Sequence, residues 1–171
     1  NSKLNAGQYE DVIAGVTGAV SVVNDAMAEL ALSAEDYIEL SDKALAAAQK
    51  ANAEEWVPVQ YRSAVVAKSG AVSDLEAKRF LSSIQKAEAV IAAAKSAETK
   101  SYQVQTEQNL RKADELIAAA KQAEQHQLSP VAYADAMKAR ELVMALNSQG
   151  KNQEAYTESV TLVQKADRAF N

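Results

Sequence analysis

Few side chains in this chain are of types and spacings that could do chemistry. His126 is the only histidine, and Glu124 is its only close acidic neighbour in the sequence, so no metal-ligating His-x-x-x-His pattern surrounds it. Glu54 and Glu55 are adjacent on an expected helix, where neighbouring side chains diverge by about 100° and do not face one substrate. We therefore expect His126 to be a solvated residue at a helix end. The chain is expected to be no enzyme and to bind no metal or cofactor.

Composition excludes further classes of site. The chain has no cysteine, which excludes disulfides, thiol catalysis and thiolate metal sites. Residues 1–55 carry ten acidic side chains and three lysines, whereas the remainder carries thirteen acids and fifteen bases. An acidic leading section argues against nucleic-acid binding, because phosphates are neutralised by a basic surface. The apolar stretch Val12–Val23 is short for a membrane span, so we expect the chain to be soluble.

Trp56, Tyr61 and Tyr133 are the candidate partner-binding residues, because exposed aromatic side chains anchor protein partners. Their positions also fit a structural role. Pro130 suits the first position of a helix, which places Leu128 and Tyr133 where the two side chains of a hydrophobic staple lie. Trp56 and Tyr61 stand in the same places relative to the other proline of the chain. We expect the staple to be their main role and partner binding to be an additional one.

The chain repeats itself at an offset of 72 residues. Residues 58–61 (PVQY) correspond to residues 130–133 (PVAY), and residues 45–48 (LAAA) correspond to residues 117–120 (IAAA). The residues that recur are those that pack helices and turn chains, and no nucleophile or phosphate-binding loop recurs with them. A period of this length indicates duplicated helical structure rather than a duplicated catalytic site.

The composition predicts an all-α fold, because the chain is rich in alanine and has only 5% aromatic residues, five glycines and two prolines. We expect about seven helices in antiparallel hairpins, arranged as two three-helix units that are related by the 72-residue repeat. A leading helix (1–32) is expected to pack on or cap a first unit (33–98) and a second unit (99–171). The second unit is expected to carry seven extra residues before its last helix.

Caps and turn residues place the expected helix boundaries. The leading helix is expected to open with Asn5 and Gln8 and to carry apolar side chains at helical spacing, namely Val12, Val16, Val20, Val23, Met27 and Leu30. Further helices are expected to begin at the capping box of residues 33–36, at Pro58, at Ser73, after a break within Thr99–Gln108, at Pro130 and after the turn of residues 147–152, with the last ending at Phe170.

The break within Thr99–Gln108 rests on a second, shorter repeat. Residues 86–98 (KAEAVIAAAKSAE) match residues 112–124 (KADELIAAAKQAE) at an offset of 26. On one continuous helix these two matching stripes would point about 80° apart, so we expect the polar stretch between them to interrupt the helix. The alternative is a single long helix, because no Gly or Pro occurs between Asp74 and Ser129.

A resemblance to a known family follows from these motifs. In residues 118–169 an Ala-rich helix is followed by a Pro-x-x-Tyr start, a Gly-Lys-Asn turn and a helix opening with Glu-Ala-Tyr, and residues 42–68 repeat the first half of that pattern. Over residues 42–171 the chain resembles the alanine-rich helical repeat domains of bacterial envelope lipoproteins of unknown function. It is also similar to tetratricopeptide hairpins, although their spacing of about 34 residues and their Trp/Gly/Tyr signature are absent.

The resemblance implies a periplasmic or outer-membrane lipoprotein whose signal peptide and lipidated cysteine precede Asn1, with that lipid as its membrane contact. Its expected function is that of a non-catalytic scaffold that binds another envelope protein through the acidic first helix or the grooves between the units. The alternative is a carrier that holds a small apolar ligand in a cavity between alanine-lined helices beneath the first helix.

Overall fold

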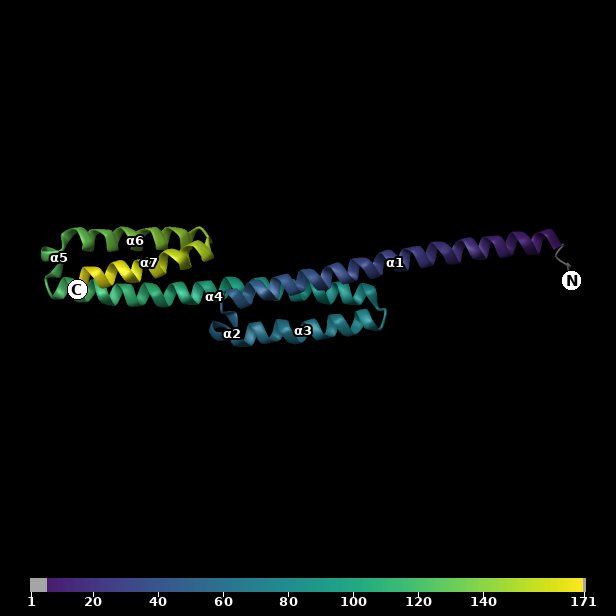
Figure 1. The fold of residues 1–171 in the computed structure, drawn as a ribbon, viewed down its shortest axis with the longest axis horizontal. Coiled ribbons are helices and arrows are strands. Elements are labelled where there is room, and N and C mark those ends of the chain that lie inside the picture. The colour runs from purple at the N-terminus through teal and green to yellow at the C-terminus, as the bar shows by residue number, and fades with distance from the viewer. Residues whose placement is uncertain (1–5, 171) are drawn as a thin grey trace. The chain divides into compact units, whose positions relative to one another are not determined.

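The computed structural model describes residues 6–170, without the side chains of residues 6–8, 125 and 128 (Figure 1). Over this range the chain is all-α, as predicted, and the described residues form no strand. The helices are α1 (Ala6–Lys50), α2 (Ala53–Trp56), α3 (Pro58–Glu76), α4 (Phe80–Gln122), α5 (Gln125–Leu128), α6 (Pro130–Ser148) and α7 (Asn152–Phe170).

Both prolines of the chain begin a helix, as predicted. Pro58 is the first residue of α3 and Pro130 the first residue of α6. A proline suits this position because its φ is already helical and its missing N–H would have no intrahelical acceptor there. Ser129 is the N-cap of α6, but its side chain makes no capping hydrogen bond. The expected turn at residues 147–152 and the end of the last helix at Phe170 are also present.

Two predicted helix starts are wrong, because the cap-like residues lie inside longer helices. Residues 33–36 lie within α1, which continues without interruption from Ala6 to Lys50. Ser73 lies within α3, and the following helix begins only at Phe80. A Ser or Asp caps a helix only where the preceding chain leaves the helical conformation, and here nothing upstream breaks it. The predicted opening at Asn5 lies outside the described residues.

The predicted break within Thr99–Gln108 is also wrong, because α4 is one helix from Phe80 to Gln122. Ser101, Gln105 and Thr106 of this stretch are buried, and two of them bind a neighbouring helix end. Ser101 Oγ and Gln105 Nε2 donate hydrogen bonds of 2.5 and 2.9 Å to the carbonyl oxygen of Ala51, just after the last residue of α1. Carbonyls at a helix end have no intrahelical donor. The polarity of this stretch therefore satisfies another helix and does not mark a loop.

The longer helices end in the same backbone turn. A residue with positive φ follows two positions after the end of α1, α3, α4 and α6, namely Asn52, Lys78, Glu124 and Gly150, with φ between 56° and 71°. This left-handed conformation lets the next amides bond back to carbonyls of the last helical turn, as Arg79 N does to Asp74 O at 2.8 Å. The starts of α4 and α7 are both two residues beyond such a turn. The predicted seven extra residues before the last helix are therefore not there.

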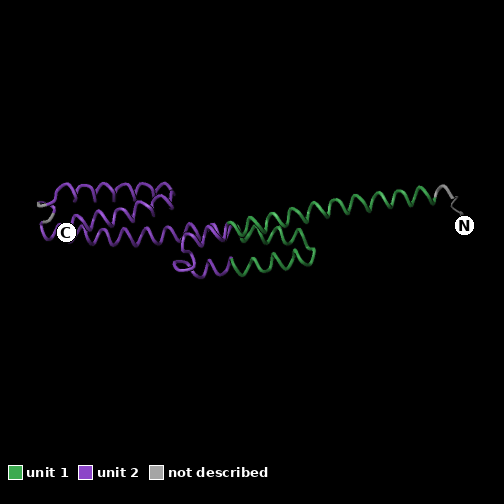
Figure 2. Tube along the Cα trace, in the orientation of Figure 1, with its two compact units in different colours: residues 1–43, 65–91 green, residues 44–64, 92–171 purple. Residues whose placement is uncertain are grey.

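The chain divides into two compact units, shown in green and purple in Figure 2. The first contains residues 1–43 and 65–91, which are parts of α1, α3 and α4. Its buried contacts are made by small side chains, among them Ala34, Ala71 and Ala87, all without accessible surface. Lys68 Nζ forms an ion pair with Asp42 and so joins α3 to α1, while Ser83 Oγ of α4 donates to the Ala71 carbonyl of α3 at 2.8 Å.

The second unit contains residues 44–64 and 92–171. An apolar cluster in this unit joins α4, α6 and α7 and is built of alanines around Ile117, Val143 and Leu162. Arg140 of α6 forms an ion pair with Asp114 of α4, with Nε 2.6 Å from Oδ1. Asn109 Nδ2 of α4 donates to Ser159 Oγ of α7 at 2.9 Å. The predicted domain boundaries, after residues 32 and 98, lie within α1 and α4, respectively.

The continuity of α4 can be tested by a proline at its exposed residue Glu107. We expect Glu107→Pro to lower the free energy of unfolding by about 3 kcal/mol or more, because the ring removes one helical hydrogen bond and clashes with the preceding turn. Urea denaturation followed by circular dichroism measures this loss. Glu107→Ala, which keeps the amide, should unfold like the wild type. Equal stability of the two variants would instead indicate an interruption of α4 at this point.

Candidate interaction surface

The first half of α1 carries a stripe of exposed apolar side chains. The α1 stripe consists of eight residues whose exposed fractions lie between 38 and 64%, namely Tyr9, Val12, Ile13, Val16, Val20, Val23, Met27 and Leu30. At about 100° per residue, all eight lie within about 60° of the direction of Val16. They therefore form one continuous face, and not a scatter of single exposed side chains.

The opposite face of this segment carries its acidic side chains, among small residues and the exposed Val22. Asp11, Asp25 and Glu29 project from α1 at about 140° or more from the centre of the stripe. There is no lysine or arginine between Lys3 and Lys43. Every residue from Tyr9 to Leu30 is exposed. The predicted role of residues 1–32 as a cap over the repeats stays a prediction.

The same face of α1 becomes buried further along the helix. Ala34 and Ser41 continue the stripe at its angular centre, and both have no accessible surface within the first unit. Ser41 is satisfied locally, since its Oγ donates to the Ile38 carbonyl at 2.7 Å. One face of one helix is thus part of the core after Ala34 and uncovered before Leu30.

A groove of about 430 Å³ lies where the stripe meets the turn between α3 and α4. Met27 and Leu30 line one side of it, and the start of α4 contributes the side chains of Phe80 and Leu81. Leu81 is 63% exposed. The groove is also lined by Lys78 and Arg79, the only basic residues among its lining side chains. The stripe therefore ends in an apolar hollow with a basic rim.

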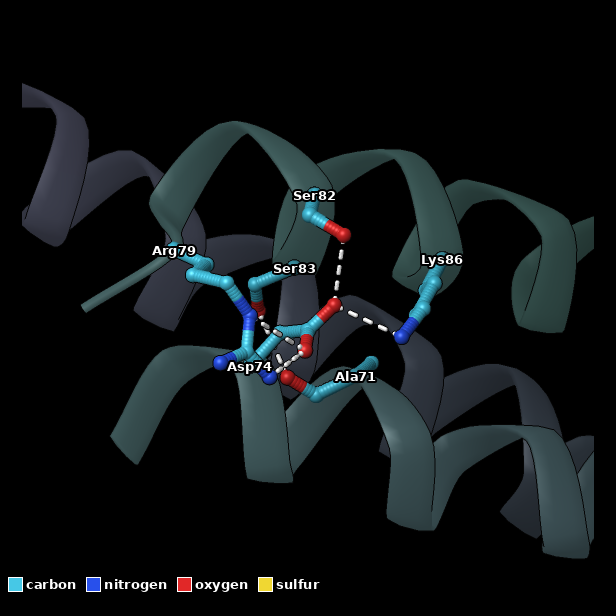
Figure 3. Close-up of polar contacts among 6 residues, drawn as sticks. All are labelled: Ala71, Asp74, Arg79, Ser82, Ser83 and Lys86. Carbon is cyan, nitrogen blue, oxygen red and sulfur yellow. Dashed lines mark hydrogen bonds and ion pairs between the residues drawn. The ribbon is translucent and has the colours of Figure 1, made fainter. Parts of the chain in front are cut away.

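Asp74 holds this turn together (Figure 3). Its side chain is only 4% exposed and accepts hydrogen bonds from three residues that follow it in the sequence. Arg79 Nε donates to Oδ1 at 3.0 Å, Ser82 Oγ donates to Oδ2, and Lys86 Nζ lies 2.7 Å from Oδ2. These donors hold the pKa of the Asp74 carboxyl far below its usual range, Lys86 contributing most, then Ser82 and Arg79, against a smaller opposing effect of burial. No pattern in the sequence had pointed to this residue.

The predicted partner-binding residues lie in the second unit, and their side chains differ in exposed fraction. Tyr61 is 9% exposed, whereas Trp56 and Tyr133 are half-buried. Tyr133 packs against the apolar cluster, and its ring centre lies 5.7 Å from that of His126. The starts of α3 and α6 place these aromatic residues at staple positions, although the side chain of Leu128 lies outside the described part. Partner binding by Trp56, Tyr61 and Tyr133 stays a prediction.

His126 differs from the solvated residue that the sequence suggested. Its ring is half-buried in α5, and its Nδ1 atom is buried without a hydrogen-bond partner. Glu54 and Glu55 lie on the exposed side of α2. No group of three or more His, Asp or Glu side chains within residues 6–170 is placed to hold a metal ion.

The carrier alternative requires a cavity between the helices that can hold an apolar ligand. A groove of about 480 Å³ lies at the surface of the second unit, lined by the first turn of α6 and by Lys165 and Arg168 of α7. The alanines at the helix contacts, such as Ala94, Ala120 and Ala166, have no accessible surface at all. A cavity large enough for a ligand would leave its lining accessible to a water-sized probe.

By length and composition, α1 is the one helix within the described residues that is long and apolar enough to cross a membrane. The segment concerned is Tyr9–Lys50, and none of its apolar window is buried. The length of Val12–Val23, which argued against a span, understates the helix because α1 continues past both ends. The acidic face of α1 disagrees with a span, since Asp25 and Glu29 would enter the hydrocarbon.

Comparison of the chain with protein-family models, curated proteins and solved structures finds no match. What the chain does is therefore inferred from its own surface.

The low pKa of Asp74 predicts how stability depends on pH. A carboxyl whose pKa is lower in the folded than in the unfolded chain adds stability above its unfolded value of 3.8, and that contribution is lost as the pH falls towards the folded value. We expect Asp74→Asn to melt below the wild type at pH 7, and the difference to shrink from about pH 5 downwards. Thermal melts between pH 2 and 7 measure this. Asp42→Asn, at a more exposed ion pair, should show a much smaller difference at pH 7.

The staple role of Trp56 is tested by truncation. We expect Trp56→Ala to lower the free energy of unfolding by about 1–3 kcal/mol, because a half-buried aromatic side chain leaves its packing partners uncovered. Val59→Ala, at a neighbouring side chain that is 77% exposed, should change it by less than about 0.5 kcal/mol. Partner binding should survive wherever the Trp56 variant remains folded. An unchanged melting temperature together with a lost partner would make Trp56 an exposed anchor.

Proposed function

We propose that this chain is a non-catalytic helical scaffold that binds a protein partner through the α1 stripe. The observation that carries the proposal is the stripe itself, eight apolar side chains exposed along one face of a helix whose same face is buried further on, at Ala34 and Ser41. A contiguous apolar patch on a protein surface marks an interaction site. Spacing of this kind is the pattern by which one amphipathic helix packs against another helical surface.

A protein partner fits the charges of α1 better than a lipid surface does. Helices that lie on membranes carry lysine and arginine on their polar face, which attract anionic lipids. The charges of this segment are all acidic, namely Glu10, Asp11, Asp25 and Glu29. Those charges would be repelled by anionic head groups, whereas they remain in water when a helix packs on the stripe.

We also propose that the body carrying the stripe arose by duplication, as two three-helix units related by the 72-residue offset. Helix boundaries support this, because the ends of α1 and α4, the whole of α2 and α5, the whole of α3 and α6, and the starts of α4 and α7 are each 72 positions apart. The ion pairs support it as well. Asp42 with Lys68 recurs 72 positions later as Asp114 with Arg140. On this proposal α4 belongs to both units.

The proposed location is the bacterial envelope, and the proposed partner is a protein of that compartment. Both rest on the resemblance of residues 42–171 to the helical repeats of envelope lipoproteins. The carrier alternative lacks an observation of equal weight, because the alanine faces between the helices have no accessible surface. A scaffold needs no such space.

The proposal is tested by a photo-crosslinking amino acid placed on or off the stripe in the cells that make the protein. Val23 and Val22 are a matched pair, since they are adjacent and 60 and 68% exposed, but Val22 lies about 120° from the centre of the stripe. We expect illumination to join the Val23 variant to one protein, identified by mass spectrometry, at several times the yield of the Val22 variant. Equal yields, or adducts with lipid alone, would contradict the proposal.

A further inference from the structure

We propose that the α1 stripe binds the α1 stripe of a second copy of this chain, with the two helices antiparallel. The inference rests on the proposed function and names the partner. Its first support is continuity, since the face that is covered by the chain's own helices at Ala34 and Ser41 is uncovered from Leu30 back to Tyr9. A second amphipathic helix laid on the stripe would extend the existing core along α1.

The uncovered segment also needs a neighbour to be a stable helix. It contains Gly15 and Gly18, whose missing side chains face open space, so no packing inside the chain compensates for their low helix propensity. Five valines and one isoleucine between residues 12 and 23 add β-branched side chains, which also favour the helix less than alanine does. Most helical stability in proteins comes from packing an amphipathic face, and within the described residues this face is exposed from Tyr9 to Leu30.

The residues beside the stripe permit self-pairing. In the heptad defined by Ile13, Val16, Val20, Val23, Met27 and Leu30, the flanking positions are occupied by uncharged residues from Val12 to Ala31. These flanking positions meet across a two-helix seam, and like charges there would repel. The acidic side chains within this stretch, Asp25 and Glu29, point away from the seam, so two copies can approach here without opposing carboxylates.

The charges at the two ends of the stripe favour the antiparallel arrangement. If Val20 faces Val23 of the other copy, Leu30 faces its Ile13, and the Glu10–Asp11 end of that copy approaches the groove at Met27 and Leu30. The rim of this groove carries Lys78, which is exposed and makes no ion pair within the described residues, and Arg79. Tyr9 and Val12 of the second copy would enter between Phe80 and Leu81. A parallel pair would instead place the Glu10–Asp11 ends side by side.

The purified full chain tests the pairing by sedimentation equilibrium over a range of concentrations. We expect a mass of twice 18.3 kDa that dissociates on dilution. Val23→Glu should raise the dissociation constant at least 100-fold. Val22→Glu, on the opposite face, should leave it within about threefold of the wild-type value. Both are made with Gly15→Ala and Gly18→Ala, which lie off the stripe and favour the helix, so that circular dichroism can show an intact α1 in each.

The orientation is tested by disulfide formation, which the absence of native cysteines makes unambiguous. We expect a mixture of the Ile13→Cys and Leu30→Cys variants to oxidise to the mixed dimer several times faster than either variant forms its own dimer. Faster formation of the like pairs would overturn the antiparallel arrangement.

Three results would overturn the pairing, and they differ in what they mean for the scaffold. A monomer at all concentrations whose Val23 crosslinks a different protein in cells would refute self-pairing and keep the scaffold. A monomer that crosslinks no protein would refute both. A monomer that floats with vesicles of anionic phospholipid, and loses this in Val23→Glu, would assign the stripe to a membrane surface instead.

Discussion

Alanine packing is the constraint on which the rest of this structure depends. Most of the buried hydrophobic side chains are alanines, and the largest fully buried side chains are Leu162, Val90 and Val143. Burial contributes about 25 cal/mol per Å² of apolar surface, so each alanine contact contributes little. The helices compensate by length, as in α4 with its 43 residues, and small side chains let the axes of packed helices approach closely. Close approach in turn brings backbone groups of one helix within reach of short polar side chains of the next.

Buried polar side chains therefore fix how neighbouring helices are aligned in this fold. Ser101 and Gln105 of α4 bind the free carbonyl of Ala51, and Ser83 binds the carbonyl of Ala71. A buried carbonyl without a donor is costly, which fixes the register at which these helices can pack. Alanine faces alone would tolerate sliding by a turn, because successive alanines present nearly the same surface. The hydrogen bonds remove that freedom.

The sequence predicted those parts of the fold that are encoded by residues close together in the chain. The prolines fixed two helix starts, Gly150 marked a turn, and the alanine-rich composition indicated an all-α fold. What failed depends on contacts between distant residues. The polar stretch Thr99–Gln108 predicts a loop, because the sequence does not show that Ala51 lies beside it. Ser73 predicts a helix cap, whereas α3 continues to Glu76. Asp74 gave no local signal, because its donors are recruited by the turn that follows it.

The sequence predicts the residues of the candidate surface but not their exposure. The helical spacing from Val12 to Leu30 was evident and the first helix was named as a partner-binding face, but only exposure distinguishes an interaction stripe from a core stripe. That distinction depends on whether other helices reach it. The aromatic residues drew attention for their type, and the structure places Tyr61 largely inside.

Because α1 is buried in its second half and exposed in its first, the stability of its backbone hydrogen bonds differs along one helix. After Ala34 its hydrogen bonds open only when the surrounding core opens, whereas from Tyr9 to Leu30 every residue is exposed and far less of the fold covers them. The two halves therefore belong to different cooperative units, although no residue separates them. On the proposed pairing, binding stabilises the helix of the first half, so the concentration of the second copy would set how much of this half is folded. The free energy that orders this half would then depend on the concentration of the second copy. Amide hydrogen exchange along α1 would therefore report the fraction of paired chains as well as the helical structure.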